Sequence, residues 1–206
     1  MNDFENGLLK YFTIKQLNKI QSQIIGIAGA GGLGSNCAFN LVRSGFKNFY
    51  IYDFDKVDYS NLNRQFYFLE QIGLPKVEAL AVNLKKINPD IELFTQEITI
   101  NESNILSLFK KCSIIVEAFD KAESKKMIAE SFYDTAKIVV SASGLAGYGN
   151  SDDIITRKIN DNFYLIGDME SECGDDLFPY SPRVNVAAAK QADIILKLTL
   201  DDKNDR

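Results

Sequence analysis

The sequence contains no histidine. That absence excludes an imidazole general base, a Ser-His-Asp triad and any metal site with histidine ligands. Cysteine is scarce as well: the three residues are Cys37, Cys112 and Cys173, and no two of them form a Cys-x-x-Cys pair. A structural zinc site with four thiolates therefore cannot be built within this chain. Its chemistry has to rest on carboxylates, amines, guanidinium groups, backbone N–H groups and at most one thiol.

Long apolar runs and an excess of positive charge are also missing. No stretch approaches the roughly 18 apolar residues of a membrane-spanning helix, and the acidic first residues do not resemble a secretory signal. The formal net charge of −5 disfavours nucleic acid as a partner but allows a local site for a small anion. We therefore expect a cytoplasmic protein that binds neither membranes nor nucleic acid.

Strand and helix patterns alternate along the chain, which predicts a Rossmann-like α/β fold with a doubly wound, mostly parallel sheet. A length of 206 residues predicts one domain over residues 1–206. The predicted strands are residues 23–28, 48–52, 91–99, 113–119 and 137–142, and the predicted helices are residues 8–20, 32–44, 75–87, 101–111 and 122–133. Two short antiparallel strands, residues 154–159 and 162–166, and a closing C-terminal helix over residues 184–200 complete this prediction.

A glycine-rich turn joins the first predicted strand to the helix that follows it. Gly29, Gly31 and Gly34 have the Gly-x-Gly-x-x-Gly spacing. The first glycine allows a tight turn, the second lets a phosphate approach the backbone, and the third allows close helix packing. Asp53 ends the next strand, about 20 residues further on, where an acid that binds a ribose is expected. The pattern predicts a nucleotide with its phosphates at the helix N-terminus.

Amide and cationic side chains follow this acid. On a helical turn Asn61 would share a face with Arg64 and with Gln65. Such a run alone is typical of a solvated turn, but beside a ribose acid it favours a polyphosphate, which the planar fork of an arginine suits well. Lys76 follows Pro75 at a predicted helix start, where its charge could neutralise a phosphate, although a surface lysine is the commoner role.

Two further residues are candidates for chemistry. Asp120 follows the strand at residues 113–119, and an acid at the carboxyl edge of a parallel sheet can hold Mg²⁺ together with phosphates; a helix N-cap explains it equally well. Cys173 lies in a loop that also holds Glu170, Glu172, Asp175 and Asp176. These acids are expected to raise the pKa of the thiol, which argues against an activated nucleophile.

These segments together resemble the ThiF/MoeB/HesA family, the bacterial relatives of ubiquitin-activating enzymes. Residues 29–35, which include Gly32, are similar to its nucleotide loop, and residues 53–65, which include Asp55, are similar to its signature block. The segments around Lys76, Asn88-Pro89 and residues 117–120 follow in the family's order. The resemblance covers roughly residues 20–145.

The resemblance implies a concrete activity. Such enzymes use ATP and Mg²⁺ to adenylate the C-terminal glycine carboxylate of a small β-grasp sulfur carrier, and they are expected to be homodimers. The short chain without zinc cysteines resembles a compact ThiF subgroup of thiamine biosynthesis. The implied catalytic residues are Arg64, Lys76 and Asp120, with Asp120 at the metal, and the implied nucleotide-binding residues are Gly29, Gly31, Gly32, Gly34, Asp53, Asp55, Asn61, Arg64, Gln65 and Lys76.

Two departures from the family pattern leave alternatives open. The family's zinc cysteines are missing, and so is the N-terminal arginine that a neighbouring subunit lends to the site, because no arginine precedes Arg43. Either Lys10, Lys15 or Lys19 substitutes for it, or that function is lost. Activation of a molybdopterin-type carrier, an NAD-dependent dehydrogenase and a non-catalytic dimer that binds a carrier are the alternative functions.

Overall fold

The computed structural model describes residues 1–171, 173–174 and 176–201, and within them seven strands form one sheet in the order β3-β2-β1-β4-β5-β7-β6. Neighbouring strands are parallel except for the pair β6 and β7. The strands are β1 (Ile24–Ala28), β2 (Asn48–Asp53), β3 (Glu92–Glu97), β4 (Ile114–Glu117), β5 (Ile138–Ala142), β6 (Ile155–Lys158) and β7 (Phe163–Gly167). The predicted Rossmann-like sheet, with its single antiparallel pair, is confirmed.

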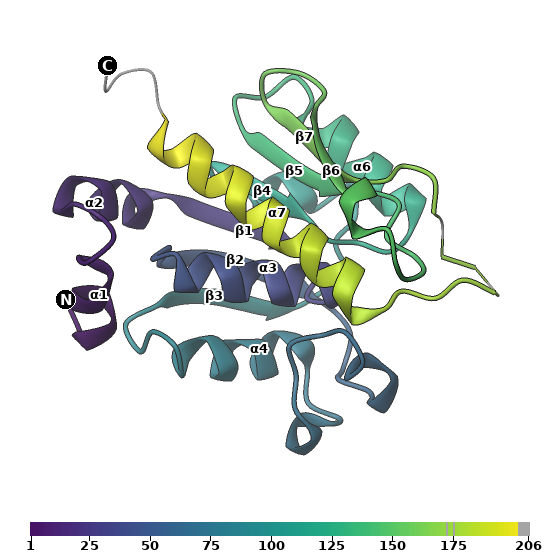
Figure 1. The fold of residues 1–206 in the computed structure, drawn as a ribbon, viewed down its shortest axis with the longest axis horizontal. Coiled ribbons are helices and arrows are strands. Elements are labelled where there is room, and N and C mark those ends of the chain that lie inside the picture. Colours follow the sequence, from purple (N-terminus) through teal and green to yellow (C-terminus); the bar gives the residue numbers. More distant parts are fainter. Residues whose placement is uncertain (172, 175, 202–206) are drawn as a thin grey trace.

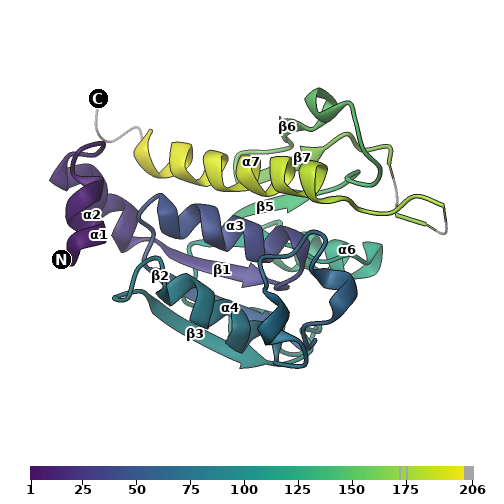
Figure 2. The same cartoon turned by 60° about the horizontal axis from the view of Figure 1, so that its bottom comes forward.

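Helices cover both faces of the sheet (Figure 1). One face carries α3 (Gly32–Arg43), α4 (Lys76–Lys85) and the closing helix α7 (Ser181–Leu200), and the other carries α5 (Ile105–Leu108) and α6 (Ala122–Phe132). Figure 2 shows α3 and α7 lying side by side. Alternate residues of one strand serve the two faces: Ile114 and Val116 join the α3–α7 core, and Ile115 joins the α5–α6 core.

Two predicted helices are wrong in extent. The helix expected over residues 8–20 is two helices, α1 (Asp3–Leu8) and α2 (Ile14–Ser22), because Thr13 caps the second one and accepts a hydrogen bond from the Gln16 N–H. The helix expected from Asn101 is only the short α5. The Asn101 side chain instead accepts from the Ser103 N–H at 3.0 Å, which fixes a turn at this point.

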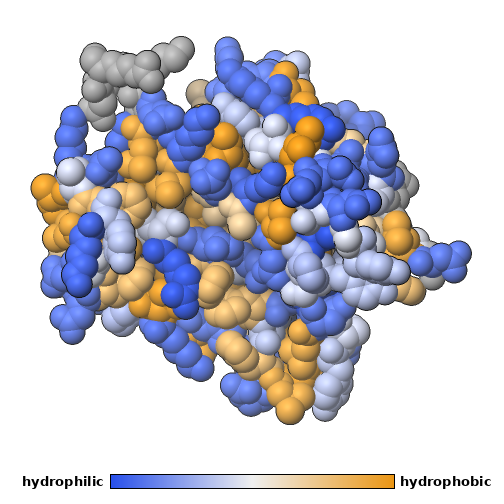
Figure 3. All heavy atoms as spheres, viewed as in Figure 1, coloured by the Kyte–Doolittle hydropathy of each residue, from blue (hydrophilic) through white to orange (hydrophobic). Residues whose placement is uncertain are grey.

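Hydrophilic side chains cover most of the face shown in Figure 3. Apolar side chains emerge at its lower edge, where the segment between β2 and α4 projects in Figure 1. A short helix, η3 (Ser151–Asp153), precedes β6 elsewhere in the fold. The segment between β2 and α4 contains the other two short helices, η1 (Tyr59–Asn61) and η2 (Leu69–Gln71). Phe68, Leu69 and Leu74 are exposed in this segment. Among the described residues, no helix combines the length and the apolar character needed to cross a membrane.

The first turn of α3 packs directly on the end of β1. A Cβ atom added at Gly34 would lie 1.9 Å from the Gly29 carbonyl oxygen, a backbone atom that cannot move aside alone. Gly29 itself has a φ of +100°, in the left-handed region that favours glycine. Both glycines are therefore needed for the turn to keep its shape.

Replacing Gly34 by alanine should lower the free energy of unfolding by about 3 kcal/mol, the upper range for overpacking a tight contact. Gly7 provides the matched control, because it lies in α1 and nothing stands within 4 Å of an added Cβ. Gly7→Ala should be neutral or stabilising by up to about 1 kcal/mol. Urea unfolding of both variants measures the difference; equal midpoints would show that the helix shifts freely away from the strand.

Candidate functional site

The glycine turn and the acid at the end of β2 are in direct contact. The Ala30 N–H donates to one carboxylate oxygen of Asp53 at 2.6 Å, and the Asp55 N–H donates to the other at 2.7 Å. Burial raises the pKa of the Asp53 carboxyl, and the two N–H donors act against that shift. The predicted phosphate turn and the predicted ribose acid are thus brought together at the carboxyl edge of the sheet.

Asn61 is the last residue of η1, and Arg64 lies on the turn that follows. The Asn61 side chain accepts from the Asp58 N–H at 3.0 Å, so it caps its own turn. The Arg64 guanidinium donates to the Ser60 carbonyl at 3.1 Å and to Asn63 Oδ1 at 2.7 Å. A Cβ atom at Gly32 would lie 3.5 Å from Arg64 Cγ, so the arginine side chain runs against the glycine turn.

Gln65 points inward and is buried. Its Nε2 would lie 3.9 Å from a Cβ atom at Gly31, and its Oε1 is buried with no hydrogen-bond partner in the part of the chain that the structure describes. A buried amide oxygen left unpaired is uncommon in native proteins. It marks a position beside the glycine turn where an additional donor is expected.

Lys76 begins α4 and is buried, unlike the surface lysine that its sequence context favoured. Its ammonium group pairs with Asp55 Oδ2 at 2.7 Å, and its N–H donates to the Asp55 carbonyl at 2.9 Å. The lysine side chain is 7% exposed and its carboxylate partner 47% exposed. The Lys76 ammonium group is therefore held against the loop that follows Asp53 at the end of β2.

Asp120 lies further from its strand than the sequence predicted. β4 ends at Glu117, and Asp120 follows in an exposed bend. It does not cap α6 either, because the N-cap residue is Lys121, without a side-chain cap. No group of three or more potential metal-ligating side chains occurs among the described residues. One exposed carboxylate fits a Mg²⁺ ion that brings phosphate ligands with it, not a cage made by protein alone.

The buried carboxylate at this edge belongs to Glu117, to which the sequence assigned no role. It accepts from Lys125 Nζ at 3.1 and 3.2 Å, from the Phe119 N–H at 2.7 Å and from the Ser141 hydroxyl. Lys125 Nζ also donates to the Ala142 carbonyl at 2.8 Å. The pair therefore ties together the ends of β4 and β5 and the first turns of α6, and it holds the bend that carries Asp120. The sequence feature that could have identified this role is a glutamate at the end of an otherwise apolar strand.

The late loop that carries Cys173 reaches this side of the site. Burial raises the pKa of the thiol, Asp120 raises it further, and Arg64 and Lys125 act in the opposite direction. The predicted direction is confirmed, but its causes are different, because desolvation comes first and the acid that acts is Asp120. Glu172 and Asp175, which were expected to contribute, lie outside the described residues.

A buried ion pair anchors the start of that loop. Arg183, in the first turn of α7, pairs with Asp168, and its other terminal nitrogen donates to the carbonyls of Gly149 and Asn150 at 3.0 and 3.2 Å. Asp168 also accepts from the Ser171 N–H at 2.9 Å. Neither residue was singled out in the sequence, because the pair depends on how α7 closes against the loop.

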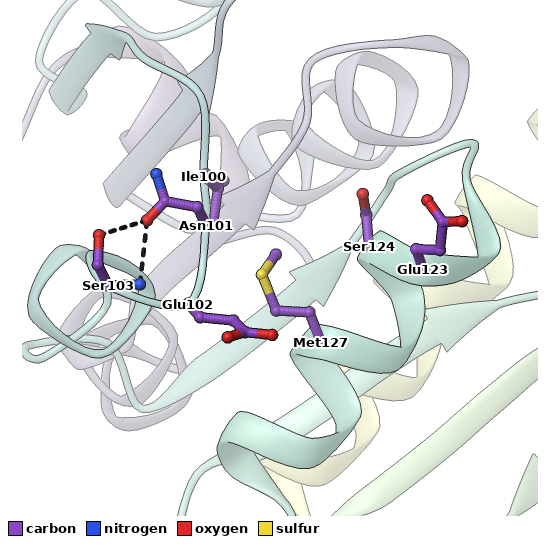
Figure 4. Close-up of a pocket in the computed structure, with 7 residues that line it drawn as sticks. All are labelled: Ile100, Asn101, Glu102, Ser103, Glu123, Ser124 and Met127. Carbon is purple, nitrogen blue, oxygen red and sulfur yellow. Dashed lines mark hydrogen bonds between the residues drawn. The ribbon is translucent and has the colours of Figure 1, made fainter.

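The segments after β3 and β4 line a cavity of about 410 Å³ (Figure 4). Ile100 and Met127 contribute apolar side chains and belong to the same α5–α6 core cluster as Phe119, whose ring lies beside Gly29. The other lining residues are polar: Asn101, Glu102, Ser103, Glu123 and Ser124. Strand order reverses between β1 and β4, and ligands of doubly wound sheets bind in the crevice outside such a point.

The N-terminal lysines lie at the opposite end of the sheet. α2, which carries Lys15 and Lys19, leads into the start of β1. Leu8 and Leu17 lie within 3.1 Å of a Cβ atom built at Gly45, just after α3 ends. α3 has 12 residues, so roughly 18 Å of helix separates this position from the glycine turn. Lys10, Lys15 and Lys19 cannot reach the site of their own chain.

A profile described as the ThiF family matches residues 5–200. The chain belongs to the ThiF family. Ubiquitin-like modifier-activating enzyme 5 of Culex quinquefasciatus is 40% identical over 108 residues, 52% of this chain and 24% of that protein. SUMO-activating enzyme subunit 2 of Dictyostelium discoideum is 32% identical over 142 residues, 68% of this chain and 21% of that protein. The chain thus spans only about a quarter of the length of these relatives.

Solved structures share the fold of this ThiF-family chain. The E. coli tRNA N6-threonylcarbamoyladenosine dehydratase TcdA in complex with ATP superposes with a TM-score of 0.88, covering 98% of this chain and 95% of that one. E. coli MccB with ATP gives a TM-score of 0.71 over 91% and 59% of the two chains. The sequence identities are 18% and 20%, so these likenesses establish the fold alone.

The Glu117–Lys125 pair should be important for stability. Lys125→Met leaves the buried carboxylate without its ammonium partner and should cost about 3–5 kcal/mol in unfolding free energy. Lys126→Met is the control on the same helix, since its pair with Glu130 is exposed and should be worth less than about 0.5 kcal/mol. Adding Glu117→Gln to Lys125→Met should recover part of the loss. Chemical denaturation of the three variants measures these values, and equal losses for the two lysines would contradict the role given to the pair.

Proposed function

We propose that this chain is an ATP-dependent adenylyltransferase that activates the C-terminal glycine carboxylate of a small β-grasp sulfur carrier. The observation that carries the proposal is the pair of donor side chains against the glycine turn: Gln65 Nε2 lies beside Gly31, and the Arg64 side chain lies beside Gly32. The Tyr67 hydroxyl contacts both the Ala30 and the Lys76 carbonyl, so the buried lysine begins its helix beside the same turn, where phosphates would meet the N-terminus of α3.

The proposed reaction needs no base. One oxygen of the carrier carboxylate attacks the α-phosphorus of ATP, the bond from that phosphorus to the oxygen bridging the α- and β-phosphates breaks, and pyrophosphate leaves with the bonding electrons. The carboxylate is already ionised at neutral pH. A protein without histidine can therefore catalyse this step by orientation and charge neutralisation.

Each part of the crevice has a place in this proposal. Asp53 accepts hydrogen bonds from the ribose, and the amides at residues 31–34 face the phosphates. Asn61 and Gln65 orient the phosphates, while Arg64 and Lys76 neutralise charge that develops on them. Asp55 keeps Lys76 in position. The base occupies the cavity after β3 and β4, between the side chains of Ile100 and Met127. Asp120 would hold Mg²⁺, which neutralises further charge on the phosphate oxygens.

The finer assignment is to a ThiS-like carrier of thiamine biosynthesis, acted on by a homodimer. Its support is that these 206 residues contain no Cys-x-x-Cys pair, together with the exposed apolar side chains between β2 and α4, which offer a surface to a second protein. Pyrophosphate exchange with a ThiS-like carrier and with a molybdopterin-type carrier tests this choice. NADH fluorescence titration tests the dehydrogenase alternative, and ATP binding without exchange would indicate a non-catalytic carrier-binding protein.

Arg64→Ala and Lys76→Ala should each lower carrier-dependent exchange of labelled pyrophosphate into ATP by about 10²-fold or more, the effect of losing one electrostatic contact in the transition state. Arg43→Ala and Lys86→Ala are the controls, because both residues are exposed at the far ends of their helices and should keep wild-type exchange. If the site variants exchange like the controls, the phosphate assignment is wrong.

Asp120→Asn should leave the fold intact, because the Asp120 side chain is exposed and does not cap α6. Exchange activity should fall by about 10-fold or more, and the Mg²⁺ concentration for half-maximal rate should rise, because one of the few protein carboxylates available to the ion is lost. A titration of the exchange rate with Mg²⁺ measures both effects. Asp134→Asn, an exposed acid beyond the far end of α6, serves as the control. If the exchange rates of wild type and Asp120→Asn depend on the Mg²⁺ concentration in the same way, Asp120 does not bind the metal.

A further inference from the structure

Tyr67 places a buried hydroxyl group behind the glycine turn. The residue is 5% exposed, and its hydroxyl donates to the Ala30 carbonyl at 2.7 Å. Ala30 is the middle residue of the segment Gly29-Ala30-Gly31 and is completely buried. Since the Ala30 N–H donates to Asp53, both hydrogen-bonding groups of this residue have a side-chain partner.

The same hydroxyl lies at the start of α4. It is 3.2 Å from the Lys76 carbonyl, so its single proton is shared between two carbonyl oxygens on two different segments. Lys76 is in turn fixed to Asp55 through both its backbone N–H and its ammonium group. Tyr67 therefore joins the glycine turn to the helix that supplies the buried lysine.

A turn made largely of glycine needs such anchors. Glycine loses more conformational freedom on folding than any other residue, and a phosphate cradle is effective only when its N–H groups are oriented before the ligand arrives. Hydrogen bonds to both sides of Ala30 restrict the peptide planes on either side of it. The anchors come from the end of β2 and from the segment before α4, so the turn is held from outside its own strand and helix.

We propose that the Tyr67 hydroxyl is a positioning group that pre-organises the glycine turn for the triphosphate and sets its distance from Lys76. This inference rests on the proposed binding of ATP. Burial raises the pKa of Tyr67 well above its usual value, and Asp53 and Asp55 raise it further, so the phenol stays a proton donor at any physiological pH.

A matched pair of variants separates positioning from simple stability. Tyr67→Phe and Tyr52→Phe each remove one buried phenol hydroxyl that donates to a backbone carbonyl. The Tyr52 hydroxyl donates to Leu108 at 3.1 Å, in the core below α5, on the opposite face of the sheet. Both variants should lower the urea midpoint by a similar amount. Only Tyr67→Phe should raise the KM for ATP in pyrophosphate exchange, by about tenfold, as loss of roughly 1.4 kcal/mol of binding requires.

Amide hydrogen exchange provides a second measurement that needs no variant. In the wild-type protein without nucleotide, the hydrogen-bonded amides of Gly29, Ala30 and Ser35 should already be protected to a degree similar to those of β1. In Tyr67→Phe this protection should fall, and in Tyr52→Phe it should not. Even if Tyr67→Phe does not fold, hydrogen-bonded amides at Gly29, Ala30 and Ser35 that are unprotected in the wild type until ATP is added would contradict pre-organisation.

The outcomes distinguish this inference from the function on which it rests. A wild-type protein that neither binds ATP nor exchanges pyrophosphate overturns the proposed function, and the positioning role with it. A wild-type protein that exchanges pyrophosphate, with a Tyr67→Phe variant whose KM for ATP matches that of Tyr52→Phe, overturns the positioning role alone. A raised KM and a loosened turn in Tyr67→Phe only would support both.

Discussion

The contact between Gly34 and the carbonyl of Gly29 determines the geometry on which the rest of the carboxyl edge depends. Because α3 begins directly against the end of β1, its N-terminal N–H groups open onto the crevice and not onto the core. Asp53, at the end of β2, accepts a hydrogen bond from the Ala30 N–H of the turn. Glu117, at the end of β4, accepts one from the Phe119 N–H. A helix displaced by the width of one methyl group would change each of these contacts.

Three cationic side chains near this edge of the sheet are buried or partly buried in ion pairs with carboxylates. Lys76 is paired with Asp55, Lys125 with Glu117, and Arg183 with Asp168, and each pair connects segments that are separate in the sequence. Burying a charge without a partner is costly, so each of these cations is held in a defined place. Because each pair is neutral as a whole, the formal net charge of −5 does not prevent the protein from holding these cations at fixed places.

The sequence predicted those features that follow from local rules. The glycine turn, Asp53 and the alternation of strands and helices could be predicted because backbone sterics and hydrophobic periodicity act over a few residues. The contact of the Tyr67 hydroxyl with the glycine turn could not, because the Ala30 carbonyl lies 37 residues away and nothing local marks the pair. The buried state of Lys76 and the Glu117–Lys125 pair also depend on tertiary packing. The helix expected over residues 8–20 was wrong because a cap at Thr13 outweighed a continuous apolar pattern.

The placement of α1 and α2 has a consequence for how the site could be completed. These helices pack against the far end of α3, so no cation from this segment can reach the glycine turn of its own chain. If an N-terminal lysine contributes there, it has to come from another molecule. Its contribution to the site would then depend on protein concentration and would be lost on dilution below the dissociation constant of the two protein molecules. The contributions of Arg64 and Lys76, which belong to the same chain as the site, would not change on dilution.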